Sequence, residues 1–70
     1  MYYKIVFAKN RIISCRETLE KVVSDEPYYE HRNGLLTYAI VRAENESQAR
    51  SIAKYLALEM KQRYEQHDAA

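Results

Sequence analysis

The dipeptide Asn33-Gly34 constrains the fold of this chain more than any other local feature. It contains the only glycine among the 70 residues. A two-residue hairpin turn of type I′ needs positive φ at both central positions, and Asn-Gly tolerates that conformation best. The segments on either side, Tyr28–Arg32 and Leu35–Arg42, carry the β-branched and aromatic residues of strands. We therefore expect these segments to form an antiparallel hairpin.

The turn also fixes which residues of the expected hairpin face each other. Arg32 lies opposite Leu35, and each further step moves both strands by one residue, so that Tyr28 lies opposite Ala39. One face of the hairpin then carries Tyr29, His31, Leu36, Tyr38 and Ile40, and we assign it to the core. The other face carries Tyr28, Glu30, Arg32, Leu35, Thr37, Ala39 and Val41.

A strand and a helix are expected at the two ends of the chain. Residues 2–8 alternate, with Tyr3, Ile5 and Phe7 on one face. Near the other end, Asn45 is a good N-cap and Gln48 follows at the spacing of a capping box. Apolar residues then recur at helical spacing and make an inward stripe of Ala49, Ile52, Ala53, Leu56, Met60 and Tyr64. This helix should run to about Gln66, and residues 67–70 should fray.

The segment between these elements allows two interpretations. Ser14 and Glu17 have the spacing of a second capping box. The helix that would follow places Cys15, Leu19, Val22 and Val23 on one face and ends near Ser24-Asp25, because Pro27 disfavours helical geometry at Glu26. The alternative makes residues 11–15 a strand that forms a hairpin with residues 2–8. We favour the helix, which gives the order β-α-β-β-α.

The fold class predicted is therefore a single α+β domain over residues 1–70, with a three-stranded, mainly antiparallel sheet and two helices on one face. A chain of this length buries only about 60% of the surface that its unfolded form exposes. Its one cysteine forms no intramolecular disulfide, and two histidines without a second cysteine make a zinc site improbable. Self-association is the remaining way to supplement so small a core.

Seven tyrosines favour exposed contact surfaces, because tyrosine combines a large ring with a polar tip. Two surfaces stand out. The outer face of the last helix carries residues spaced four, three and four apart, namely Ser51, Tyr55, Leu58 and Gln62. The sheet face opposite the helices, here called the open sheet face, should carry Tyr2, Lys4, Tyr28, Arg32, Leu35 and Val41. An exposed sheet edge is a third route to binding, unless Lys4 and Lys9 on the first strand protect it, and the sequence does not decide between these two interpretations.

Nucleic-acid binding is the alternative function. The first 16 residues carry Lys4, Lys9, Arg11 and Arg16 without an acidic residue, and Tyr2 and Tyr28 on the open sheet face could stack on bases. The net charge of only +1 gives weak overall attraction to a polyanion. Binding of this kind would depend steeply on salt.

Enzymatic activity is not expected. Cys15, His31 and Glu30 could suggest a nucleophile and a base, but Glu30 and His31 point to opposite faces of one strand and Cys15 lies in another element. No glycine-rich loop is present to bind phosphate. We expect no cofactor, no metal and no small-molecule substrate.

The expected location is cytoplasmic. A lone thiol fits a reducing compartment, and the N-terminus does not resemble a secretion signal. The longest apolar run, within residues 35–41, is too short to cross a bilayer, so no membrane association is expected.

The strand at residues 39–43, followed by Asn45 and the helix through Ala53, resembles a strand-to-helix unit of small domains from phages and mobile elements. The likeness covers about a third of the chain and implies no functional residues. From the exposed surfaces we predict a non-enzymatic protein-binding or self-assembling module, either a homodimer or an inhibitor or adaptor of a larger protein.

Overall fold

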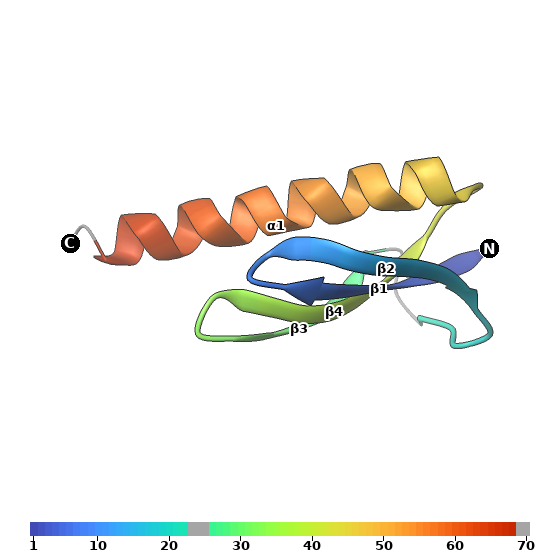
Figure 1. Cartoon of the computed structure of the whole chain (residues 1–70), viewed down its shortest axis with the longest axis horizontal. Coiled ribbons are helices and arrows are strands. Elements are labelled where there is room, and N and C mark those ends of the chain that lie inside the picture. The colour runs from blue at the N-terminus through green and yellow to red at the C-terminus, as the bar shows by residue number, and fades with distance from the viewer. Residues whose placement is uncertain (23–25, 69–70) are drawn as a thin grey trace.

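The computed structural model describes residues 1–22 and 26–68. This part of the chain forms the strands β1 (Tyr2–Ala8), β2 (Arg11–Thr18), β3 (Tyr28–Arg32) and β4 (Leu35–Arg42), followed by the helix α1 (Glu46–Asp68). The strands form one antiparallel sheet in the order β2-β1-β4-β3, and α1 lies across one face of it (Figure 1). The α+β class is confirmed. The predicted three strands and two helices are wrong, because the described residues form four strands and one helix.

A second hairpin turn accounts for the extra strand. Lys9 and Asn10 have φ angles of 53° and 61°. Two successive positive φ angles are the mark of a type I′ turn, and Asn33-Gly34 forms the other one with φ angles of 53° and 82°. The chain thus reverses at Lys9-Asn10 without a glycine, because asparagine tolerates the left-handed region well.

Residues 11–18 are therefore the strand β2, and the helix predicted there is wrong. Ser14 and Glu17 lie in this strand, opposite Val6 and Tyr3 of β1, and cap no helix. Cys15 lies opposite Ile5 and is buried, so it joins the core from a strand. The hairpin alternative is confirmed.

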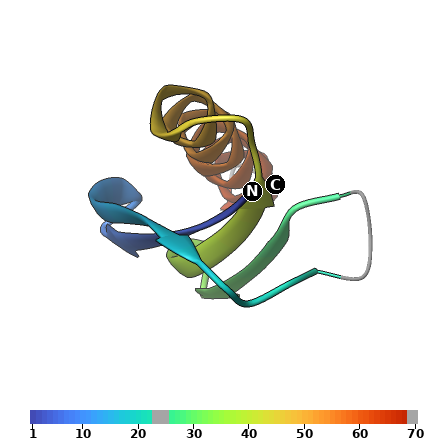
Figure 2. The same cartoon turned by 90° about the vertical axis from the view of Figure 1, so that its right-hand side faces the viewer.

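The other residues assigned to that helix lie in the connection between β2 and β3. Leu19 is 96% exposed, and Val22 is the last of the described residues 1–22. Val23 and the helix end expected at Ser24-Asp25 lie outside the described residues. β2 and β3 are opposite edges of the sheet, and Figure 2 shows the described chain that follows β2 passing below the sheet, on the side away from α1.

A β-bulge changes the predicted register of β3 and β4. Arg32 lies opposite Leu35 and His31 opposite Leu36, as expected, but Glu30 then lies opposite Tyr38 instead of Thr37. Thr37 is thus the extra residue, and a bulge shifts every later residue by one position. The remaining pairs are Tyr29 with Ala39 and Tyr28 with Ile40.

The bulge exchanges the two faces along the rest of β4. Val41, predicted on the open sheet face, is 0% exposed and belongs to the core. Ala39 is likewise fully buried. Tyr38 and Ile40, predicted in the core, lie on the open sheet face, where Val6 and Lys4 of β1 are their neighbours. The prediction is correct for Leu36, which is 2% exposed.

The core lies between α1 and the sheet. From β1 it takes Tyr3, Ile5 and Phe7, which confirms the predicted alternation. The facing residues of α1 include Ala49 and Ala53, both 0% exposed, whose small side chains let the helix lie close to the sheet. The partly buried Ile52, Leu56, Ala57 and Tyr64 complete the contact.

The helix begins as the sequence predicts, with one difference in detail. The Gln48 N–H donates to Asn45 Oδ1 at 2.8 Å, as an N-cap requires. In a capping box the Gln48 side chain would accept from Asn45 N. Its Oε1 instead accepts from Glu44 N, one residue earlier, at 2.6 Å. The helix continues to Asp68, two residues beyond the predicted end, and residues 69 and 70 lie outside the described part.

The two hairpin turns are joined by the Asn10 side chain. Asn10 Nδ2 donates to Gly34 O at 3.2 Å, and Leu36 N donates to Asn10 Oδ1 at 2.8 Å. Gly34 also lies directly under the Tyr64 ring of α1, and His31 meets the same ring edge-on, with 5.7 Å between ring centres. This end of the sheet is thus held together by side chains from both hairpins and the helix.

Candidate interaction surfaces

The outer face of α1 carries the first predicted surface. The side chains of Tyr55 and Leu58 are 64% and 53% exposed, and Ser51 and Gln62 are exposed beside them. The helix period places these four residues opposite the buried stripe. Figure 2 shows that none of the described strands covers this side of α1.

The open sheet face can be described as rows of neighbouring residues that cross the strands. The middle row is Arg16, Lys4, Ile40 and Tyr28, and the next row is Ser14, Val6, Tyr38 and Glu30. A third row at the end of the sheet holds Thr18, Tyr2 and Arg42. Of the residues predicted here, Tyr2, Lys4 and Tyr28 lie in these rows, and Arg32 and Leu35 pair next to the β3–β4 turn.

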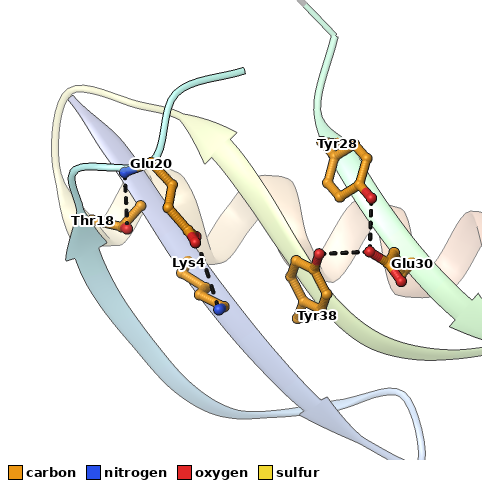
Figure 3. A network of polar contacts seen from close by, with 6 residues as sticks. All are labelled: Lys4, Thr18, Glu20, Tyr28, Glu30 and Tyr38. Carbon is orange, nitrogen blue, oxygen red and sulfur yellow. Dashed lines mark hydrogen bonds and ion pairs between the residues drawn. The ribbon is translucent and has the colours of Figure 1, made fainter. Parts of the chain in front are cut away.

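Two tyrosines and a glutamate form an ordered cluster on this face. The hydroxyls of Tyr28 and Tyr38 both donate to Glu30 Oε2, at 2.7 and 2.6 Å (Figure 3). Their ring centres are 6.1 Å apart with the planes tilted by 46°. Lys4 Nζ lies 4.9 Å from the centre of the Tyr38 ring, within cation–π range. The cluster depends on the bulge, which brings Tyr38 opposite Glu30.

These hydrogen bonds shift the pKa values of all three groups. The bonds from Tyr38 and Tyr28 stabilise the carboxylate and lower the pKa of Glu30 below its usual 4.5. The bond to Glu30 raises the pKa of Tyr38 well above 10.0, and that of Tyr28 in the same direction. The stabilising contribution of Glu30 is therefore present above pH 4.5 and is lost as pH falls through its lowered pKa. That of the tyrosines is present below pH 10.0 and is lost as pH rises through their raised pKa values.

Glu30→Gln should bring the pKa of Tyr38 back toward 10.0, because a neutral amide does not oppose the tyrosinate charge. A titration of tyrosinate absorbance would show a larger fraction of the seven tyrosines ionising at moderately alkaline pH. Glu20→Gln is the matched control, since Glu20 pairs with Lys4 on the same face. Identical titration curves for wild type and Glu30→Gln would contradict the cluster.

The other end of the open sheet face is partly covered by the chain that follows β2. Glu20 Oε2 lies 3.8 Å from Lys4 Nζ (Figure 3), and Tyr2 Oη is 3.5 Å from the carbonyl oxygen of Val22. Thr18 Oγ1 accepts from Glu20 N at 3.2 Å and holds this turn. The polar groups of Tyr2 and Lys4 thus have partners within the chain, so this end is less available than the sequence suggests.

The four basic residues proposed to bind nucleic acid lie in different parts of the structure. Lys4 and Arg16 lie next to each other on the open sheet face, and Lys9 lies in the β1–β2 turn. Arg11 instead lines a groove of about 380 Å³ between β2 and α1, together with Asn10, Ile12, Arg50, Lys54 and Ala57. A second groove, of about 350 Å³, lies on the other side of the helix and is lined by Glu26, Pro27, Tyr29, Leu56, Glu59, Met60 and Arg63.

The edges of the sheet are β2 and β3. β1 is an inner strand, so the expectation that Lys4 protects an exposed edge is wrong. β3 has only five residues, and a short edge strand is itself a protection against unwanted pairing.

The groups considered for catalysis do not form a site. Burial raises the pKa of the Cys15 thiol, which makes it a poor nucleophile. His31 packs on Tyr64, on the face opposite Glu30. Among the described residues, no group of three or more His, Cys, Asp and Glu side chains could hold a metal ion. Nor does the helix within this part of the chain have the apolar length to cross a membrane.

Comparison with protein-family models, curated proteins and solved structures finds no match to this chain.

Proposed function

We propose that the protein is a non-enzymatic protein-binding module and that the outer face of α1 is its binding surface. The observation that carries the proposal is the exposure of Tyr55 and Leu58 on the side of the helix opposite the core. Large aromatic and aliphatic side chains on an uncovered helix face are typical of helix-mediated protein contacts. Such a module would act by occupying a surface of its partner.

The outer face of α1 has better support than the open sheet face. On the sheet, the hydroxyls of Tyr28 and Tyr38 are bonded to Glu30, and Ile40 is only 7% exposed. Tyr55 and Leu58 have no comparable cover within the described chain. Tyr55 and Leu58, at 64% and 53%, are also more exposed than Tyr28 and Leu35 of the open sheet face, at 44% and 49%. Burial of exposed apolar surface drives association.

Leu58→Glu should weaken association by roughly tenfold or more, because a charge replaces an apolar side chain at the centre of the contact. Absolute mass from light scattering over a dilution series would show the change. Leu35→Glu is a matched control, since Leu35 is 49% exposed but lies beside the β3–β4 turn. Both variants should fold, because neither residue is buried.

Two outcomes bear on the proposal. A mass that falls for Leu58→Glu and stays unchanged for Leu35→Glu would support the helix surface. If the mass is unchanged for Leu58→Glu, and the immobilised variant retains the same proteins as wild type, the outer face of α1 is not the binding surface.

Nucleic-acid binding stays a prediction with less support. The four cations Lys4, Lys9, Arg11 and Arg16 are spread over the open sheet face, a turn and the β2–α1 groove. Within the described residues, Lys4 is also paired with Glu20. A basic patch or stripe on one face is the usual footprint of nucleic-acid binding, and the separation of these four residues weakens the case for it.

A further inference from the structure

Two opposite charges flank the exposed residues of α1. Lys54 lines the groove on the β2 side of the helix, and Glu59 lines the groove on the β3 side. Tyr55 and Leu58 lie between them on the outer face. Both charged residues are exposed, and within the described part of the chain neither has an ion pair or a side-chain hydrogen bond.

The positions of these charges distinguish the two ways in which a second helix could pack on this face. When two identical helices pack in parallel about a two-fold axis, the left flank of one meets the right flank of the other. A residue on one flank then lies near the residue five positions later on the partner. Lys54 and Glu59 have this spacing, so each contact would contain two Lys54–Glu59 pairs. In an antiparallel pair, like flanks meet, which brings Lys54 near its own copy and Glu59 near its own copy.

We propose that the partner of the outer face of α1 is a second copy of this chain, packed helix to helix with the two α1 helices parallel. This inference rests on the proposed function and adds the identity of the partner and its orientation. Tyr55 and Leu58 of the two copies form the apolar centre, and the Lys54–Glu59 pairs set the direction. The sheets lie on the outside of the dimer, because each covers the opposite side of its own helix (Figure 2).

The extent of the surface determines how tight such a dimer is. From Ser51 to Gln62 the helix rises by about 17 Å. A single helix face of this length buries a much smaller area than the roughly 800 Å² per partner of a standard stable interface. Ser51 and Gln62 at its ends add little apolar area. The dimer is therefore weak and forms at micromolar or higher concentrations, so its test needs concentrated protein.

An exchange of the two charges tests the orientation. Lys54→Glu and Glu59→Lys should each weaken dimerisation by about thirtyfold, because two attractive pairs become two repulsive ones. The double variant Lys54→Glu/Glu59→Lys should dimerise like wild type, since both pairs are restored with reversed sign. Sedimentation equilibrium over a concentration series measures the three dissociation constants. Arg32→Glu is the control for Lys54→Glu, because it makes the same change in net charge on the β3–β4 hairpin.

A cysteine variant tests the geometry independently of charge. In the parallel dimer Ser51 lies beside Ser51 of the second copy, whereas in an antiparallel dimer it lies beside Gln62. Ser51→Cys should therefore form a disulfide-linked dimer under mild oxidation, while Cys15, which is buried, should not. Circular dichroism of each variant checks that the fold is unchanged.

Each outcome supports or overturns the inference. Restored dimerisation in the double variant, together with cross-linking of Ser51→Cys, supports the parallel dimer. If Leu58→Glu dissociates the dimer but the charge exchange does not restore it, the helix surface is correct and the parallel orientation is wrong. A wild-type protein that stays monomeric at millimolar concentration overturns the second copy as partner and leaves the proposed binding of another protein to its own test.

Discussion

Gly34→Ala should lower the free energy of unfolding by about 2 to 5 kcal/mol, the sum of backbone strain and overpacking. The φ angle of 82° at Gly34 is one that residues with a Cβ rarely adopt. A Cβ atom there would also lie 2.6, 2.8 and 2.9 Å from Cγ, Cδ2 and Cδ1 of Tyr64. An aromatic ring cannot bend away, so either α1 or the β3–β4 turn has to move. Chemical denaturation monitored by circular dichroism measures the loss.

A double-mutant cycle separates the two causes. In a Tyr64→Ala background the ring is absent, so Gly34→Ala should cost only the backbone strain of about 1 to 2 kcal/mol. Gly34→Asn in the wild type retains the overpacking but relieves part of the strain, because asparagine tolerates positive φ. Equal costs of Gly34→Ala with and without Tyr64 would show that the ring does not restrict this position.

Gly34 is also an example of a feature of the fold that is determined by the local sequence. Asn33-Gly34 predicts the β3–β4 turn because few other dipeptides adopt its conformation. The buried stripe of α1 is predicted just as directly, since Ala49, Ala53 and Met60 recur at helical spacing over several turns. Elements that depend on one strong local preference, or on a long repeat, were predicted correctly.

The strand β2 is only the second choice from the sequence, because its signals are weak and conflicting. The turn at Lys9-Asn10 lacks glycine, and the hydrogen bonds of the Asn10 side chain go to residues more than 20 positions away, which local sequence does not reveal. Ser14 and Glu17 have the spacing of a helix cap by coincidence. Burial of Cys15 against Ile5, a contact between different parts of the chain, decides in favour of the strand.

The bulge at Thr37 has no signal in the local sequence. A plain hairpin register places Val41 on the open sheet face, whereas pairing of β4 with β1 draws Val41 into the core. The same shift creates the Tyr28–Glu30–Tyr38 cluster, which could not be predicted without the bulge. The exposure of Tyr55 and Leu58 followed directly from helical periodicity. The exposure of Lys54 and Glu59 follows from the same periodicity. The grooves of the folded structure are needed to show that Lys54 lies on the β2 side of the helix and Glu59 on the β3 side.

The second large effect on stability is expected at Asn10, whose side chain joins the two hairpin turns. Asn10→Ala should lower the free energy of unfolding by about 2 to 4 kcal/mol, because two hydrogen bonds are lost and alanine is strained at positive φ. The Leu36 N–H, which donates to Asn10 Oδ1, would lose its partner in a partly buried place. This loss is larger than that of an ordinary turn substitution, because both hairpins and the end of α1 meet here.

Asn10→Gly is the matched control, since glycine adopts the φ angle of 61° without strain but makes neither side-chain bond. It should cost about 1 kcal/mol less than Asn10→Ala, and the difference measures the backbone strain. Hydrogen exchange at the Leu36 amide should be faster in both variants, because both remove its acceptor. If exchange at Leu36 is unchanged while stability falls, the cost arises in the β1–β2 turn alone and the two hairpins are not coupled through Asn10.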